Sequence, residues 1–169
     1  MTDATCATVM DAVFAMDAYE HNPDDGAWAN DLAGFFSNLV DNELGNYFLA
    51  AVSAGLEQQD NNFSAIAYMS NVTSGETIIS YRETNNLPRD FYNGYGVGAG
   101  FPGGPDALNA VGFYQQVADQ LGESWRGAPD ITVVGHSLGG GLAGFIGAIY
   151  GVKGVLFDSM TFNTAASPE

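Results

Sequence analysis

The sequence predicts an α/β protein, a three-layer α/β/α sandwich with a mostly parallel sheet, as one domain over residues 1–169. From Asp106 onward the chain alternates helix, strand, helix and strand, which implies parallel strands joined by right-handed crossovers. Residues 63–82 instead hold two β-rich runs around the turn-forming residues 71–75, which predicts an antiparallel hairpin. A hydrophobic content of 46% in 169 residues is ample for one core.

The residues before the hairpin predict two helices. Apolar side chains recur at helical spacing over residues 5–19, and this segment also carries Cys6, the single cysteine, which we interpret as a residue of the helix face. A second helix is predicted over residues 46–58. Residues 20–45 mix turn signals, acidic residues and aromatics, and they are left unassigned.

After the hairpin, residues 85–105 are rich in glycine, proline, asparagine and aromatics, which predicts a loop. An ordinary connection and a flap bordering an apolar groove are both open, whereas a dinucleotide fingerprint lacks the strand and helix that it needs. A helix is then predicted over residues 106–120, with Asp106 as its N-cap. We expect its buried face to carry Leu108, Val111, Gly112, Gln115, Val117, Ala118 and Leu121.

The charge balance excludes several classes of partner. Four Lys and Arg residues stand against 20 Asp and Glu residues, giving a formal net charge of −16. This field repels phosphate backbones and anionic membrane surfaces, so no nucleic-acid partner is expected. No apolar run is long enough for a membrane span, and the N-terminus shows no signal peptide. We expect a soluble protein, extracellular or cytoplasmic, whose oligomeric state is left open.

The most informative motif is the pentapeptide of residues 135–139, Gly-His-Ser-Leu-Gly. It follows the apolar run 131–134 and precedes a helix of small residues, so the serine lies at the apex of a strand-to-helix turn. This is the arrangement of a nucleophile elbow, in which Ser137 is raised above the carboxyl edge of a parallel sheet. We expect the Leu138 backbone N–H, at the start of the helix, to face the same point.

Glycines surround this serine. A Cβ on Gly135 or Gly139 is expected to collide with neighbouring chain, because a strained turn brings the backbone segments close together. Gly140, Gly141 and Gly144 are expected to let the following helix lie close against the sheet.

These residues resemble the α/β-hydrolase superfamily, and most of all the class 3 lipase group and its bacterial relatives. The resemblance includes the elbow, the residues 155–163 after it, and the upstream turn Arg82-Glu83-Thr84, which is similar to the lipases' Arg-Gly-Thr or Arg-Gly-Ser turn. It implies a partial α/β-hydrolase fold, with Thr84 as a second oxyanion donor beside Leu138. Glu83 departs from the family's glycine and puts a carboxylate where negative charge develops.

A serine hydrolase also needs a base and an acid. The chain has two histidines. His136 adjoins Ser137, and adjacent residues on a tight turn point apart, so a supporting hydrogen-bonding role is preferred. His21 precedes the serine, whereas the family's base follows both serine and acid. Asp158 ends a predicted strand and is either the acid or a loop-stabilising residue.

Because the family's sheet continues through two further strands that carry acid and histidine, we expect the domain to be truncated at its C-terminus. The resemblance implies hydrolysis of carboxylic esters, as in lipids, through an acyl-enzyme on Ser137, with no cofactor and no metal. The chain alone is then expected to be slow or inert. Two alternatives stay open: a degenerate hydrolase fold that binds an apolar ligand or partner, and acyl transfer from a carrier thioester.

Overall fold

The computed structural model describes residues 10–16, 47–52, 63–70, 76–82, 104–122, 126–128 and 130–160. Several sequence predictions concern residues outside these ranges, namely those for Cys6, His21, Glu83, Thr84 and most of the loop 85–105.

The centre of the fold is a five-stranded sheet with the order β1-β2-β3-β4-β5. Its strands are β1 (Tyr47–Val52), β2 (Ser64–Ser70), β3 (Thr77–Arg82), β4 (Ile131–His136) and β5 (Lys153–Phe157). The pairs β1/β2 and β2/β3 are antiparallel, whereas β3/β4 and β4/β5 are parallel. All strands except β2 therefore run in one direction, which confirms the mostly parallel sheet and the hairpin at residues 63–82.

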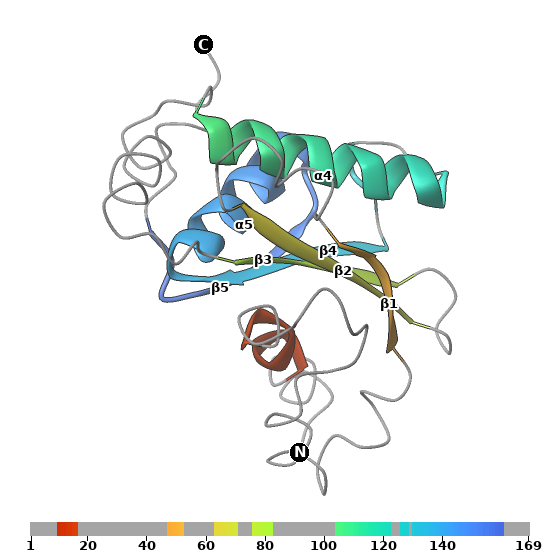
Figure 1. The fold of residues 1–169 in the computed structure, drawn as a ribbon, viewed down its shortest axis with the longest axis horizontal. Coiled ribbons are helices and arrows are strands. Elements are labelled where there is room, and N and C mark those ends of the chain that lie inside the picture. The colour runs from red at the N-terminus through yellow and green to blue at the C-terminus, as the bar shows by residue number, and fades with distance from the viewer. Residues whose placement is uncertain are drawn as a thin grey trace, which may run out of the picture.

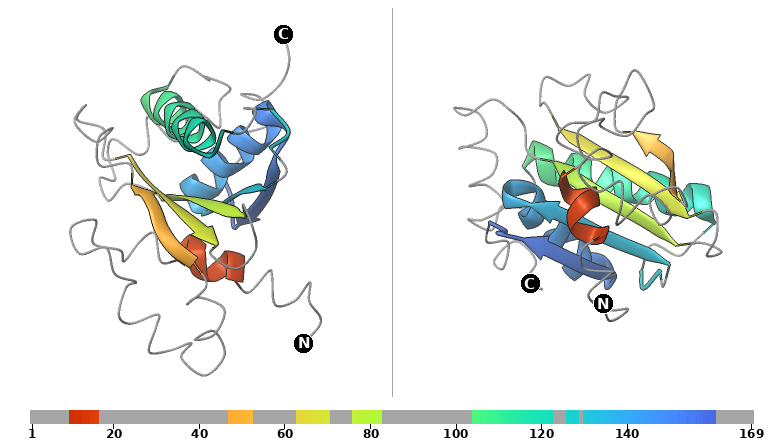
Figure 2. Two further views of the ribbon diagram at one scale, coloured as in Figure 1. Left: turned by 90° about the vertical axis from the view of Figure 1, so that its right-hand side faces the viewer. Right: turned by 90° about the horizontal axis from the view of Figure 1, so that it is seen from below.

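Helices lie on both faces of this sheet. Helices α4 (Pro105–Leu121) and α5 (Ser137–Tyr150) cover one face, and helical residues 10–16 cover the other (Figures 1 and 2). The three-layer prediction is confirmed. Because parallel strands end at the same edge, β3, β4 and β5 bring their carboxyl ends together, with α5 starting from that edge.

Each face of the sheet has its own core. Large buried side chains under α4 and α5 include Phe113 and Phe145. On the opposite face Phe14 packs against Tyr68, with ring centroids 4.8 Å apart. The buried Ser80 hydroxyl donates a hydrogen bond to the Phe14 carbonyl oxygen at 3.0 Å, which ties the N-terminal helical segment to the sheet.

The helix predicted over residues 46–58 is wrong where the structure describes it, because residues 47–52 form β1. The segment pairs antiparallel with β2, with an irregular register between Leu49 and Ala51. Its aromatic and β-branched residues suit a pleated strand. The hairpin also offers β1 an open edge with which to pair, so the tertiary partner decides the conformation.

Helix α4 confirms the prediction for residues 106–120 but differs in detail. Asp106 is not the N-cap, since Gly104 holds that position without a side-chain cap and Pro105 begins the helix. The predicted apolar stripe is confirmed at Val117 and Ala118 and is wrong at Leu108, which is 57% exposed. The buried face carries Asp106, Ala107, Ala110, Phe113, Tyr114, Val117 and Ala118. Small alanines on this face let α4 pack closely.

Candidate functional site

The turn between β4 and α5 has a sharply bent backbone. His136 has extended angles, with φ −117° and ψ 147°, and the next residue, Ser137, has φ 53°. Left-handed backbone is uncommon for residues that carry a Cβ, and it is held only where the surrounding chain enforces it. Ser137 is partly exposed. A strand, a strained serine and a helix therefore follow one another as the sequence predicts.

Two glycines make this turn possible. A Cβ on Gly135 would overlap the Gly139 carbonyl group and lie 2.8 Å from the Gly140 nitrogen. A Cβ on Gly139 would overlap the Tyr81 carbonyl oxygen at the end of β3. The collisions expected at both positions are present. The turn that carries Ser137 is therefore in close backbone contact with α5 on one side and with β3 on the other.

One of the two predicted oxyanion donors, Leu138, lies at the carboxyl edge of the sheet. Leu138 belongs to the first turn of α5, where backbone N–H groups have no partner within the helix and carry partial positive charge. Its side chain is buried, which anchors that turn. Arg82 ends β3 beside the elbow, because Tyr81 pairs with Gly135 in the parallel register. Thr84 and Glu83 lie outside the described residues.

Asp158 follows β5 at the level of Ser137, because His136 and Phe157 are partners in the β4/β5 register. It is exposed, with φ 45°. Within the described part of the chain, Ser137 and Asp158 are the two non-glycine residues with positive φ. The strained positions therefore follow adjacent parallel strands, side by side.

The segment after Asp158 adds to the prediction for two helix glycines. A Cβ on Gly140 would lie 3.1 Å from the Gly135 carbonyl oxygen of β4, in line with close packing of α5 on the sheet, but it would lie 2.8 Å from the Ser159 Cβ. The nearest neighbour of a Cβ on Gly141 would be the Met160 carbonyl oxygen, and not the sheet. Gly144 is buried in α5. Sequence reasoning missed this contact. The run of three glycines signals a close approach but does not name the segment that approaches.

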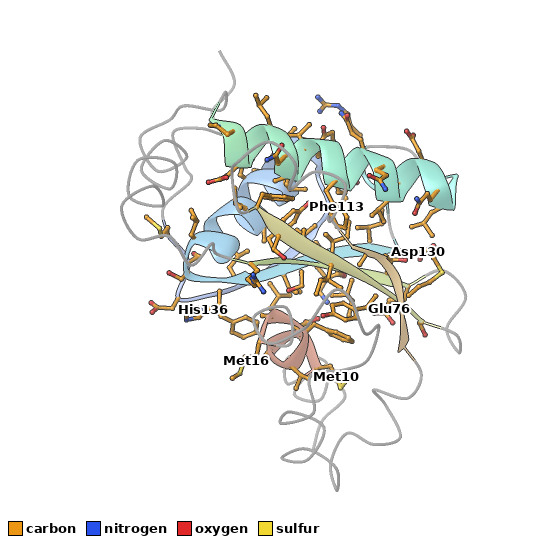
Figure 3. All side chains as sticks on the ribbon, viewed as in Figure 1. Met10, Met16, Glu76, Phe113, Asp130 and His136 are labelled. Carbon is orange, nitrogen blue, oxygen red and sulfur yellow. The ribbon has the colours of Figure 1, made fainter. Side chains whose placement is uncertain are left out.

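His136 is exposed at the end of β4 and is the one histidine within the described residues (Figure 3). Its backbone is extended, and the chain bends at the next residue, Ser137. His21 lies outside the described ranges. Among the residues that the structure describes, no three His, Cys, Asp or Glu side chains group as metal ligands.

Comparison with known proteins assigns the chain to a family. Residues 10–167 match the model of the Tle-like phospholipase domain, a phospholipase-like family. The chain belongs to this family. The Tle-like domain is also similar to a fungal lipase in complex with an inhibitor, a structure from which a model for interfacial activation in lipases was drawn. Sequence identity is 12% and the TM-score is 0.46, over 88% of this chain and 55% of that lipase. No curated protein matches the chain.

Three tyrosines of this Tle-like domain, Tyr81, Tyr114 and Tyr150, lie close together between the sheet and its two helices. Tyr81, whose carbonyl oxygen contacts Gly139, donates its hydroxyl to the Ala110 carbonyl oxygen of α4 at 3.2 Å. Burial raises the Tyr81 pKa well above its ordinary value, and the neighbouring Tyr114 and Tyr150 raise it further. The neutral, hydrogen-bonded ring therefore holds the end of β3 in place.

The far end of α5 is also anchored. The Tyr114 and Tyr150 rings stack with centroids 4.4 Å apart, and Gln115 donates to the Tyr150 hydroxyl at 2.8 Å. The Arg126 guanidinium donates to the Ile149 carbonyl oxygen at 3.3 Å.

Among the described helices of the domain, none has both the length and the apolar character to cross a membrane.

Proposed function

We propose that this Tle-like domain hydrolyses carboxylic esters of lipids, with Ser137 as the nucleophile. The observation that carries the proposal is the backbone of Ser137, whose φ of 53° lies at a strand-to-helix turn. Strained backbone of this kind persists at functional sites because the surrounding chain holds it there. Membership of a phospholipase-like family supports a lipid ester as the substrate.

In the proposed reaction, the Ser137 hydroxyl oxygen attacks the ester carbonyl carbon while a base accepts the hydroxyl proton. The carbonyl oxygen becomes an oxyanion, which the Leu138 N–H stabilises, with Thr84 as the proposed second donor. The C–O bond to the alcohol then breaks, and the alcohol leaves with the proton. Water attacks the resulting acyl-enzyme, releases the fatty acid and restores the serine.

Asp158 is the proposed acid, which would orient the base. Asp158 directly follows β5 and is level with Ser137 in the β4/β5 register. Neighbouring strands lie about 4.8 Å apart, so one basic side chain can bridge the Asp158 carboxylate and the Ser137 hydroxyl. Its exposure at the carboxyl edge leaves its carboxylate accessible. The base itself is proposed to come from outside the described residues, because His136 adjoins Ser137 and adjacent residues on a tight turn are expected to point apart.

The test is hydrolysis of p-nitrophenyl butyrate and of phosphatidylcholine vesicles by wild type, Ser137→Ala and Asp158→Asn. Ser70→Ala is the matched control, since Ser70 ends β2 at the opposite edge of the sheet. A hydrolase that lacks one member of its catalytic set keeps about 10³-fold over the uncatalysed rate, which comes from the oxyanion hole and substrate binding alone. Wild-type turnover is expected to exceed this residual rate, Ser137→Ala is expected to fall to it, and Ser70→Ala is expected to keep the wild-type rate.

Turnover by Ser137→Ala within twofold of wild type would overturn the proposal. If the wild type hydrolyses neither ester and instead binds a fluorescent fatty acid, the proposal is also wrong, and the alternative of a ligand-binding hydrolase fold is correct.

A further inference from the structure

The segment that follows β5 is fastened to the first turn of α5. The Met160 N–H donates a hydrogen bond to the Ser137 carbonyl oxygen at 3.0 Å. A carbonyl oxygen has two lone pairs, so this bond adds to the one that Ser137 accepts as the first residue of α5. The backbone of the strained serine is therefore restrained from outside its own helix.

This contact requires glycine in α5. A Cβ on Gly140 would lie 2.8 Å from the Ser159 Cβ, and 3.1 Å from both the Ser159 Cα and the Gly135 carbonyl oxygen. A Cβ on Gly141 would lie 3.2 Å from the Met160 carbonyl oxygen. Glycine weakens a helix relative to alanine, so Gly140 and Gly141 near the start of α5 are unfavourable for the helix itself. Close approach of the Ser159–Met160 segment gives them a structural reason.

The same segment begins at Asp158, so the contact restrains both strained residues of the candidate site. Ser137 has φ 53° and Asp158 has φ 45°. The hydrogen bond from Met160 fixes the first, and the position of Ser159 against Gly140 fixes the second. Because β4 and β5 run parallel, both restraints act at one edge of the sheet (Figure 1).

We infer that Gly140 and Gly141 are positioning residues for the Ser137 reaction, because they admit the Ser159–Met160 segment that fixes the backbones of Ser137 and Asp158. This role rests on the proposed function of Ser137. A misplacement of reacting groups by about 1 Å can cost about 100-fold in rate, so a displaced segment should slow the reaction without weakening substrate binding.

The experiment measures kcat and KM for p-nitrophenyl butyrate, the thermal midpoint, and hydrogen exchange of the Met160 amide. The variants are Gly140→Ala, Gly140→Ala with Ser159→Gly, and Gly147→Ala as the control. Gly147 lies in the same helix, and a Cβ there would meet the Val152 carbonyl oxygen at 3.3 Å, far from the elbow. The control therefore carries the same chemical change in the same helix, with milder crowding than the 2.8 Å contact at Gly140.

Gly140→Ala is expected to lower kcat about 10- to 100-fold with KM within about twofold, and to speed exchange of the Met160 amide. Gly147→Ala should keep kcat within about twofold even where its thermal midpoint shifts. Adding Ser159→Gly to Gly140→Ala removes the closest clash and leaves the 3.1 Å contacts with the Ser159 Cα and the Gly135 carbonyl oxygen, so kcat and amide protection should recover in part.

The outcomes separate the two proposals. If wild type is active, Ser137→Ala is inactive, and Gly140→Ala matches Gly147→Ala in kcat, the positioning role is overturned while the proposed function stands. Unchanged Met160 exchange in Gly140→Ala also overturns the positioning role, whether or not Ser137 reacts. Absence of wild-type hydrolysis overturns both.

Discussion

Replacing Gly139 by alanine tests whether the backbone after Ser137 lies in close contact with β3. The new Cβ would overlap the Tyr81 carbonyl oxygen and lie 3.3 Å from the Arg82 Cα. Tyr81 cannot move aside easily, because its strand pairs with β2 and β4 on both sides and its hydroxyl is bonded to Ala110. Overpacking of this kind costs about 1–3 kcal/mol, and a rigid backbone neighbour favours the upper end.

The matched control is Gly112→Ala in α4, where a Cβ would meet nothing within 4 Å. Both variants gain about 1 kcal/mol of helix propensity, so Gly112→Ala is stabilised by about that amount. Gly139→Ala should lose about 2 kcal/mol net. In a domain of this size 1 kcal/mol corresponds to about 2–4 °C, so the two thermal midpoints should differ by about 6–12 °C.

The assay is thermal unfolding followed by far-UV circular dichroism, with urea denaturation to confirm the free-energy differences. A thermal midpoint of Gly139→Ala equal to or above that of Gly112→Ala would refute the reasoning, since the clash with β3 would then be absent.

Three further variants test the core on both sides of the sheet. Ser80→Ala leaves the buried Phe14 carbonyl oxygen without its donor, so urea unfolding should show a loss of about 1–2 kcal/mol, and no loss would contradict the contact. Tyr81→Phe should cost about 0.5–1.5 kcal/mol and remove a phenol that ionises, in ultraviolet titration, only well above its ordinary pH or on unfolding. Burial raises the pKa of Asp11 and Glu76 adds to this, while Lys153 opposes it. Since the folded state then favours the protonated carboxyl, stability should fall as pH rises from about 4 through the raised pKa. Asp11→Asn should lack that fall, and parallel pH profiles of the two proteins would show that the carboxyl is not perturbed.

Local signals in the sequence were sufficient for the hairpin and the elbow. The β-rich runs flanking residues 71–75 specify β2 and β3, and the apolar run 131–134 followed by small residues specifies β4 and α5. The conformation of residues 47–52 could not be predicted in the same way. Their pattern fits a helix or a strand, and pairing with β2 selects the strand.

The candidate site was predictable only in part, for a similar reason. A Cβ on Gly135 would collide with Gly139, which is near in sequence, and a Cβ on Gly139 would collide with Tyr81 of β3. The requirement for glycine at both positions follows from the tight turn of the motif. The contact of Gly140 with Ser159 depends on how the chain turns after β5. At that turn Asp158 has positive φ, and no glycine at this position indicates such a conformation in the sequence.

The central claim, that Ser137 carries the reactive hydroxyl, is tested most directly by treating the folded domain with a fluorophosphonate and mapping the adduct by peptide mass spectrometry. The account predicts one phosphonylated peptide, modified at Ser137, with no adduct after heat denaturation or in Ser137→Ala. An unmodified Ser137 in the folded domain, or an adduct on another serine that persists in Ser137→Ala, would contradict it.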